Sequence, residues 1–143
     1  MNQAKIEDIK NAKWLFFDVG STLVDENKPY TRRLHEIAEA VNEPFEVIQE
    51  RVLEYYKQKK KGEYIVMQEY AIERPIWRSE EEELYPESYE CLEVLSKKYK
   101  IGVIANQVPG TAGRLEKHGV LKFIDLLVAS AEDGHEKPHK TIF

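Results

Sequence analysis

The sequence has a single cysteine, Cys91, so no disulfide can form within the chain. One cysteine fits a reducing compartment. The N-terminal residues lack the apolar core of a signal peptide. The longest apolar runs fall far short of the roughly 20 residues that a membrane-spanning helix needs. We therefore expect a cytoplasmic protein with no membrane partner.

Basic residues are in the minority, with 21 Lys and Arg against 26 Asp and Glu and a formal net charge of -5. A net acidic surface repels phosphate backbones, so we expect no nucleic-acid partner. A small phosphorylated ligand is not excluded, because the local electrostatic potential at a site can be positive although the net charge of the protein is negative. Hydrophobic residues make up 42% of the 143 residues, which is enough for a packed core. The length suits one domain, or a small core with an inserted subdomain.

Apolar runs that end at turn residues predict a parallel sheet. The run from Trp14 to Val19 stops at Gly20 and is apolar on both faces, which is typical of a central strand. Strands and helices then alternate in the C-terminal part, as helix Pro86–Tyr99, strand Ile101–Ala105, helix Thr111–His118 and strand Phe123–Ala129. This order predicts an α/β fold with a doubly wound parallel sheet.

A helical insertion interrupts this alternation. A first helix begins at Pro29, a second begins at Pro44 and ends at Gly62, and a weaker third covers about 63–73. The acidic run Glu80–Glu83 is interpreted as a solvated connection. The predicted organisation is a core formed by residues 1–25 and 84–143, with an inserted helical domain at 26–83.

Polar residues follow each predicted strand. Asp18 ends the first, Asn106 follows the second, and Lys137 lies in the loop after the third. The carboxyl ends of parallel strands meet at one edge of the sheet, where ligands gather in such folds. Each residue also has a plainer interpretation, since Asp and Asn favour turns and a loop lysine is often only solvated.

Three segments resemble, in order, the first three motifs of the haloacid dehalogenase superfamily of hydrolases. Phe17-Asp-Val-Gly-Ser-Thr-Leu-Val24 is similar to the first motif, hydrophobic-Asp-x-Asp-x-Thr. Ile101-Gly-Val-Ile-Ala-Asn-Gln107 is similar to the second, a strand that ends in Ser or Thr, often followed by Asn. Glu136-Lys-Pro-His-Lys-Thr-Ile-Phe143 is similar to the third, in which Lys-Pro precedes a helix. The helical insertion matches the family's cap.

This resemblance implies a Rossmann-like core with a helical cap, and a Mg²⁺-dependent phosphatase that acts on a small phosphorylated metabolite. It implies Asp18 as the nucleophile that forms an aspartyl phosphate, with Lys137 stabilising charge. Ser21, Thr22 and Asn106 would bind or orient the substrate, and backbone amides of the turn after Asp18 would cradle an anion. The carboxylate of Asp18 and the carbonyl of Gly20 would bind Mg²⁺.

Three departures from the family pattern keep two other functions open. Gly20 stands where family phosphatases carry an Asp that acts as general acid and base, and Ala105 replaces the hydroxyl of the second motif. The acidic fourth motif that binds Mg²⁺ would lie beyond Phe143. Metal-free attack at carbon, as in dehalogenation, is one alternative, and a degenerate, non-catalytic binding protein is the other.

The strand that carries the fourth motif lies beside the first strand in the family's sheet. Without it the sheet is incomplete, and the strand from Trp14 becomes an exposed edge. We therefore expect a partner chain or a further segment to cover that edge.

Overall fold

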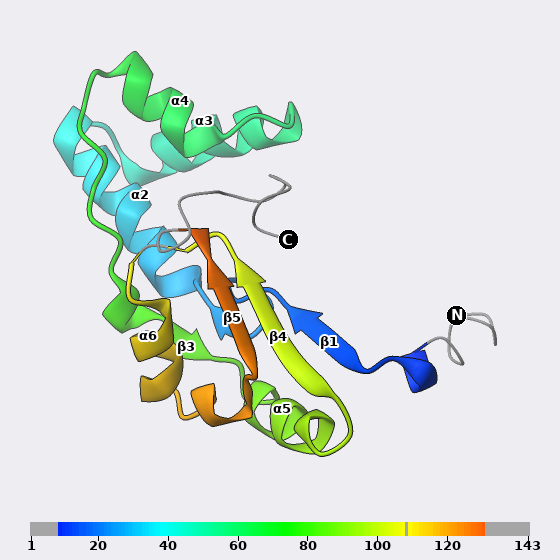
Figure 1. Ribbon diagram of the computed structural model, residues 1–143. Helices are drawn as coiled ribbons and strands as arrows, with labels where there is room; N and C mark the ends of the chain where they lie inside the picture. The colour runs from blue at the N-terminus through cyan, green and yellow to red at the C-terminus, as the bar shows by residue number, and fades with distance from the viewer. Residues whose placement is uncertain (1–8, 108, 131–143) are drawn as a thin grey trace. The chain divides into compact units, whose positions relative to one another are not determined.

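The computed structural model describes residues 9–107 and 109–130. The chain divides into two compact units. We call residues 1–25 and 83–143 the core unit, and residues 26–82 the helical unit. Figure 1 shows the helices and strands of both units.

A three-stranded parallel sheet forms the centre of the core unit. Its strands are β1 (Trp14–Phe17), β4 (Lys100–Ala105) and β5 (Leu126–Ala129), in the order β1-β4-β5 (Figure 1). Phe17 pairs with Val103, and Ala105 pairs with Ala129. The parallel α/β fold predicted from the sequence is therefore confirmed.

The central strand of this sheet is β4, and β1 has β4 as its one neighbour among the described strands. On one face Leu15, Phe17 and Val103 pack in an apolar cluster with Leu92 of α5 (Ser88–Ser96). On the other face, Trp14 is 37% exposed and Phe16 is 53% exposed. Within the described residues this strand is thus an edge strand, as expected in the sequence analysis, and the burial on both faces that is typical of a central strand is not found. That a partner chain or further segment covers the edge stays a prediction.

The chain leaves and re-enters the core unit through a short antiparallel pair, β2 (Val24–Asp25) and β3 (Glu83–Leu84). The carbonyl oxygen of Leu23 accepts a hydrogen bond from the amide of Tyr85 at 3.0 Å. It also accepts one from the buried hydroxyl of Ser88 at 2.7 Å. These two bonds hold the segment before β2, where the chain leaves the core unit, next to the segment after β3, where it re-enters that unit. Sequence analysis missed both strands, because two residues are too few for a periodic pattern.

The helical unit consists of α2 (Asn27–Val41), α3 (Phe45–Lys57) and α4 (Gly62–Glu69), followed by a 3₁₀ turn at Ser79–Glu81. Its apolar core comes from all three helices and comprises Leu34, Ile37, Ala38, Ile48, Val52, Val66 and Met67. These side chains recur on one face of each helix, which is the pattern that places them in a core.

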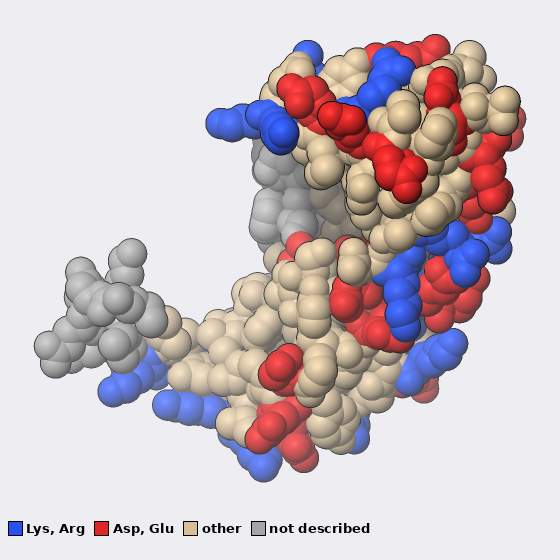
Figure 2. Space-filling view, turned by 180° about the vertical axis from the view of Figure 1, so that it is seen from behind, with Lys and Arg blue, Asp and Glu red and all other residues tan. Residues whose placement is uncertain are grey.

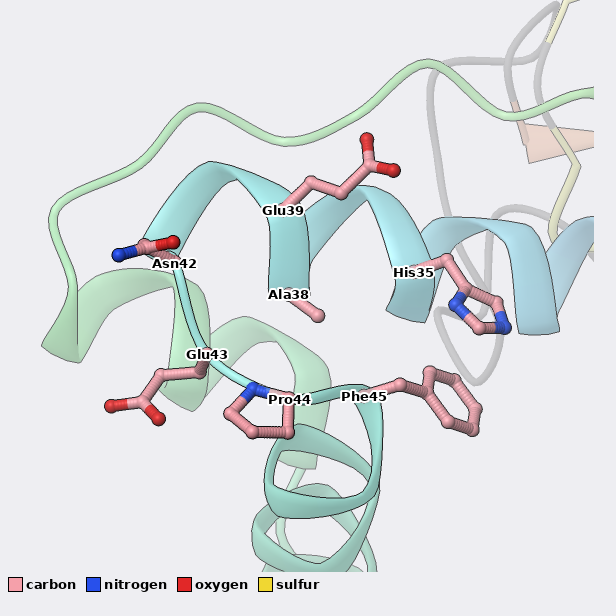
Figure 3. Close-up of a pocket in the computed structure, with 7 residues that line it drawn as sticks. All are labelled: His35, Ala38, Glu39, Asn42, Glu43, Pro44 and Phe45. Carbon is pink, nitrogen blue, oxygen red and sulfur yellow. The ribbon is translucent and has the colours of Figure 1, made fainter.

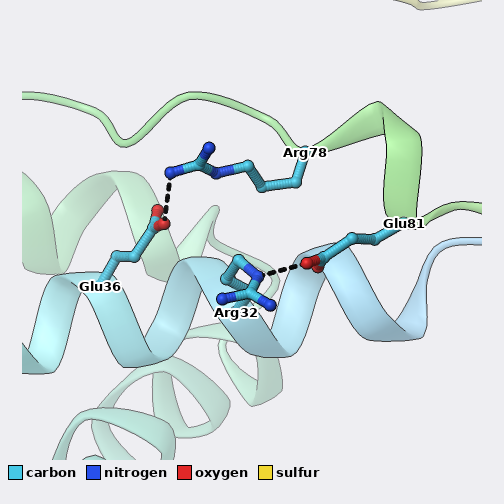
Figure 4. A network of polar contacts seen from close by, with 4 residues as sticks. All are labelled: Arg32, Glu36, Arg78 and Glu81. Carbon is cyan, nitrogen blue, oxygen red and sulfur yellow. Dashed lines mark hydrogen bonds and ion pairs between the residues drawn. The ribbon is translucent and has the colours of Figure 1, made fainter.

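Exposed ion pairs join the end of this unit to α2. Arg32 pairs with Glu81 at 2.5 Å, and Arg78 pairs with Glu36 at 3.1 Å (Figure 4). Pairs of this kind contribute about 0–1 kcal/mol each, so they orient the segment more than they stabilise it. Acidic and basic side chains are interspersed on the face shown in Figure 2.

Gly62 begins α4 and does not end α3, which corrects the sequence prediction. Helix α3 ends at Lys57, and Lys59 takes the left-handed backbone conformation there, with φ of 59°. A Cβ on Gly62 would lie 2.3 Å from the carbonyl oxygen of Val52. The glycine is thus required by the close approach of α4 to the backbone of α3.

One ion pair in the helical unit is buried. The Nη1 of Arg33 lies 3.4 Å from the Oε1 of Glu63, and their side chains are 4% and 10% exposed. Arg33 also stacks its guanidinium over the Trp77 ring, 4.6 Å from the centroid. Burial lowers the pKa of Arg33, and the nearby positive charge of Arg74 acts in the same direction. The Nε of Arg33 and the Oε2 of Glu63 are buried without a hydrogen-bond partner, so the ion pair compensates only part of the cost of removing the two groups from water.

The acidic run Glu80–Glu83 is only partly the solvated connection predicted from the sequence. Glu82 is 6% exposed and its carboxylate accepts a hydrogen bond from the Trp77 indole at 2.6 Å. Glu83 forms part of β3. The acidic character of this run does not show that the indole N–H of Trp77 gives Glu82 a buried hydrogen-bond partner.

We predict that Gly62→Ala lowers the free energy of unfolding by about 1–3 kcal/mol, because the methyl group meets rigid backbone. Urea unfolding measures this. The control is Gly113→Ala in α6 (Thr111–Lys117), where a Cβ meets nothing within 4 Å. There the better helix propensity of Ala predicts a gain of about 0.5–1 kcal/mol. A neutral Gly62→Ala would show that α3 and α4 are not in close backbone contact.

We also predict that Glu63→Ala destabilises the protein by about 3–5 kcal/mol, because it leaves the guanidinium of Arg33 buried without its carboxylate. Glu81→Ala, which breaks the exposed pair with Arg32, is expected to cost at most about 1 kcal/mol. Chemical denaturation of both variants makes the comparison. Similar losses for the two would contradict the burial of the Arg33 pair.

Candidate active site

Asp18 lies directly after β1 at the carboxyl end of the sheet. Its side chain is exposed, and its Oδ1 accepts a hydrogen bond from the amide of Val19 at 2.9 Å. This local bond orients the carboxylate relative to the turn that follows. Asp18 therefore stands at the end of the sheet where ligands gather in parallel α/β folds.

The turn after Asp18 is organised around the carbonyl oxygen of Val19. That oxygen accepts hydrogen bonds from the amides of Thr22, Leu23 and Val24 at 3.2, 2.9 and 3.0 Å. Ser21 takes the left-handed conformation, with φ of 57°, and its amide donates to the carbonyl of Val24 at 2.8 Å. Backbone amides of this turn were expected to cradle an anion, but those of Ser21 and Thr22 are donated within the turn. The exposed hydroxyl groups of these two residues are the candidates for ligand contact.

Asn106 follows β4 and is exposed at the same edge of the sheet. Because Phe17 pairs with Val103 in parallel register, Asp18 and Asn106 both extend beyond the carboxyl ends of neighbouring strands. Ala105, which replaces the expected hydroxyl, is fully buried in the apolar cluster of the core unit. Asp18, Ser21, Thr22 and Asn106 thus all follow the carboxyl ends of the neighbouring strands β1 and β4. Lys137 lies outside the described residues.

Three polar residues at this edge of the sheet were not predicted as site residues from the sequence, namely Gln107, Arg114 and Ser130. Ser130 directly follows β5, and its hydroxyl is hydrogen-bonded to the backbone of Gln107. Arg114 in α6 donates to the side-chain oxygen of Gln107 at 3.2 Å. The rule that selected Asn106, a polar residue just after a strand, would also have selected Ser130. Nothing in the sequence pattern marks Arg114, because its contact depends on how α6 packs.

The described residues supply only part of a magnesium site. Among them, no group of three or more His, Cys, Asp or Glu side chains is placed to hold a metal ion. The two ligands expected from the sequence, the carboxylate of Asp18 and the carbonyl of Gly20, belong to the segment directly after β1. Mg²⁺ prefers an octahedral oxygen environment, which it completes with water and substrate phosphate when protein ligands are few.

A hollow of about 460 Å³ lies in the helical unit, where α2 turns into α3 (Figure 3). His35 and Phe45 stack at one side of it, with ring centroids 3.9 Å apart, and Glu39 and Glu43 line it too. None of the site residues predicted from the sequence lines this hollow. Its chemistry gives no reason to place catalysis there.

Comparison with known proteins identifies the family. Residues 12–143 match the profile of the haloacid dehalogenase-like hydrolases. The chain therefore belongs to that family of hydrolases, as the three motifs predicted. A comparison with curated proteins finds no match.

Solved structures agree on the fold. A putative HAD-hydrolase from Bacillus subtilis, described as bound to magnesium, has a TM-score of 0.61 and 18% identity, and the match covers 92% of this chain and 69% of that one. A putative phosphatase from Clostridium difficile has a TM-score of 0.62 and 20% identity, with 92% and 67% covered. The L-2-haloacid dehalogenase of Xanthobacter autotrophicus has a TM-score of 0.55 and 16% identity, with 92% and 62% covered.

At such identities these likenesses establish the shared fold and no substrate. Within the described part of the chain, no helix is long and apolar enough to cross a membrane.

Proposed function

We propose that this hydrolase is a phosphatase that acts on a small phosphorylated metabolite, with Asp18 as its nucleophile. The observation that carries the proposal is the exposed carboxylate of Asp18 at the carboxyl end of β1, in a chain that belongs to a hydrolase family. Phosphatases among the structures of similar fold support this substrate class.

The proposed reaction has two steps. A carboxylate oxygen of Asp18 attacks phosphorus, and an oxygen–phosphorus bond forms while the bond to the leaving oxygen breaks with its electron pair. Water then hydrolyses the aspartyl phosphate and regenerates the carboxylate with inorganic phosphate. Splitting the reaction in this way replaces one difficult displacement by two easier ones.

Asn106 and the hydroxyl groups of Ser21 and Thr22 are proposed to orient the phosphoryl group, since all three side chains are exposed at the edge that carries Asp18. Lys137 is proposed to stabilise negative charge on the phosphoryl group. We further propose that Mg²⁺ is required and that it is held largely through the substrate, because the site supplies few protein ligands. The helical unit is proposed to act as the cap that selects the substrate.

The absence of a side chain at Gly20 affects which phosphate esters this enzyme would hydrolyse rapidly. A position without a side chain cannot protonate a leaving alkoxide, and loss of a general acid costs roughly 10²–10⁴-fold in rate. A phenolate, or the carboxylate that leaves an acyl phosphate, needs no such proton. We therefore propose a preference for aryl or acyl phosphates over alkyl phosphates.

The same glycine favours one other reaction. Attack of Asp18 on the carbon of a 2-halo acid expels a halide, which needs neither a proton nor a metal ion. The similar fold of a haloacid dehalogenase supports this alternative. A protein that binds phosphate without turnover would be the non-catalytic alternative, and the tests below separate the three.

We predict that Asp18→Asn lowers kcat for an aryl phosphate by roughly 10³-fold or more, because the nucleophile is lost. Wild type should hydrolyse the aryl phosphate roughly 10²–10⁴-fold faster than an alkyl phosphate. Steady-state assays of both proteins with both esters provide the measurement.

The matched control is Asp125→Asn at the amino end of β5, where the carboxylate accepts the amide of Ile101 at 2.8 Å. The asparagine keeps an acceptor oxygen there, so activity should be unchanged. Equal rates for wild type and Asp18→Asn would end the assignment of Asp18 as nucleophile.

Removal of metal separates the two reactions. If the protein is a phosphatase, a chelator should abolish ester hydrolysis, and added Mg²⁺ should restore it. Halide release from a 2-halo acid that persists in chelator would instead establish attack at carbon. Assays of phosphate and halide release in parallel distinguish the two, and binding of inorganic phosphate without either release would identify the non-catalytic protein.

A further inference from the structure

Gln107 is held through its backbone at the end of β4 by a residue of the neighbouring strand end. The amide of Gln107 donates to the Oγ of Ser130 at 3.1 Å. The Ser130 hydroxyl donates in turn to the carbonyl oxygen of Gln107 at 3.3 Å. These two bonds continue the β4–β5 ladder beyond its last pair, Ala105 with Ala129, by using a side chain in place of backbone.

Gln107 is also held through its side chain, by an arginine of α6. The Nη2 of Arg114 donates to the Oε1 of Gln107 at 3.2 Å and to the Oγ1 of Thr111 at 3.2 Å. Its Nη1 donates to the carbonyl oxygen of Pro109. Thr111 is 1% exposed, so this guanidinium is anchored to a buried point of α6. Two separate elements thus restrain one residue.

The restrained residue is the immediate neighbour of Asn106. A strand end is ordinarily free to change its backbone angles once ladder bonds stop, so a binding residue there needs other contacts to keep its geometry. Ala105 carries no hydroxyl that could contribute a polar contact at this strand end. The bonds to Gln107 therefore restrain the backbone that presents Asn106.

We infer that Ser130 and Arg114 are positioning residues, which hold Gln107 so that the side chain of Asn106 is presented to a phosphoryl group at the carboxyl end of β4. This inference rests on the proposed function for the identity of the ligand. Ser130 acts through Gln107 and not on the substrate, because its single hydroxyl proton is donated to the Gln107 carbonyl.

The first test is independent of catalysis. Ser130→Ala removes the acceptor of the Gln107 amide, so hydrogen exchange of that amide, followed by NMR, should become roughly 5- to 10-fold faster. The matched control is Ser96→Ala, which removes a serine hydroxyl bonded to the Glu93 carbonyl at 3.0 Å within α5. Exchange at Gln107 should be unchanged in the control. Unchanged exchange in Ser130→Ala would overturn the inference.

The second test separates positioning from stability. If Asn106 is misplaced, Ser130→Ala and Arg114→Met should each raise KM for an aryl phosphate by roughly 5- to 10-fold, with kcat within about 2-fold. Ser130→Thr keeps a hydroxyl and should restore KM. A purely structural role would lower the fraction of folded enzyme, so that kcat falls and KM stays constant. That outcome would overturn the inference.

If the proposed function is wrong, the result is distinguished by a different measurement. If wild type hydrolyses no ester, the dissociation constant of inorganic phosphate replaces KM as the measured quantity. A weaker phosphate affinity in Ser130→Ala, but not in Ser96→Ala, would then support the positioning role in a non-catalytic protein. Absence of phosphate binding by wild type would overturn both proposals together.

Discussion

The parallel pairing of β1, β4 and β5 is the constraint on which the site depends. Because the three strands run in one direction, the residues that follow them meet at one edge, although Asp18, Asn106 and Ser130 are far apart in the sequence. An antiparallel arrangement would send alternate strand ends to opposite edges. The apolar packing of β4 against both neighbours thus has a chemical consequence, since it gathers a carboxylate, an amide and a hydroxyl at a common edge.

The elements of the sheet and the Asp18 and Asn106 positions could be predicted from the sequence, because strand ends are marked by a change from apolar to polar residues. What covers a strand could not be predicted in this way. The run Trp14–Phe17 is apolar on both faces, yet Phe16 is 53% exposed. The residue pattern of a strand shows whether each of its faces is apolar, but it does not show which elements cover that face.

Contacts between elements that are distant in the sequence could not be predicted from it either. Gly62 followed a basic run and was interpreted as a helix end, whereas the structure requires a glycine there because α4 starts against the backbone of Val52. Glu82 and Arg33 are charged but buried, each beside Trp77. Arg114 has a role only because α6 places it beside Gln107. In each case the deciding partner is a tertiary contact, which local composition does not encode.

The contact of Arg33 with Trp77 also has a practical consequence. The chain has two tryptophans, of which Trp14 belongs to the core unit and Trp77 to the helical unit. Each unit therefore contains its own fluorophore, and the two stand in different surroundings: a partly solvated strand edge for one indole, a guanidinium face and a carboxylate for the other. Replacing either indole by a phenyl ring would leave an optical signal from a single unit, so that the order in which the two units melt becomes directly observable.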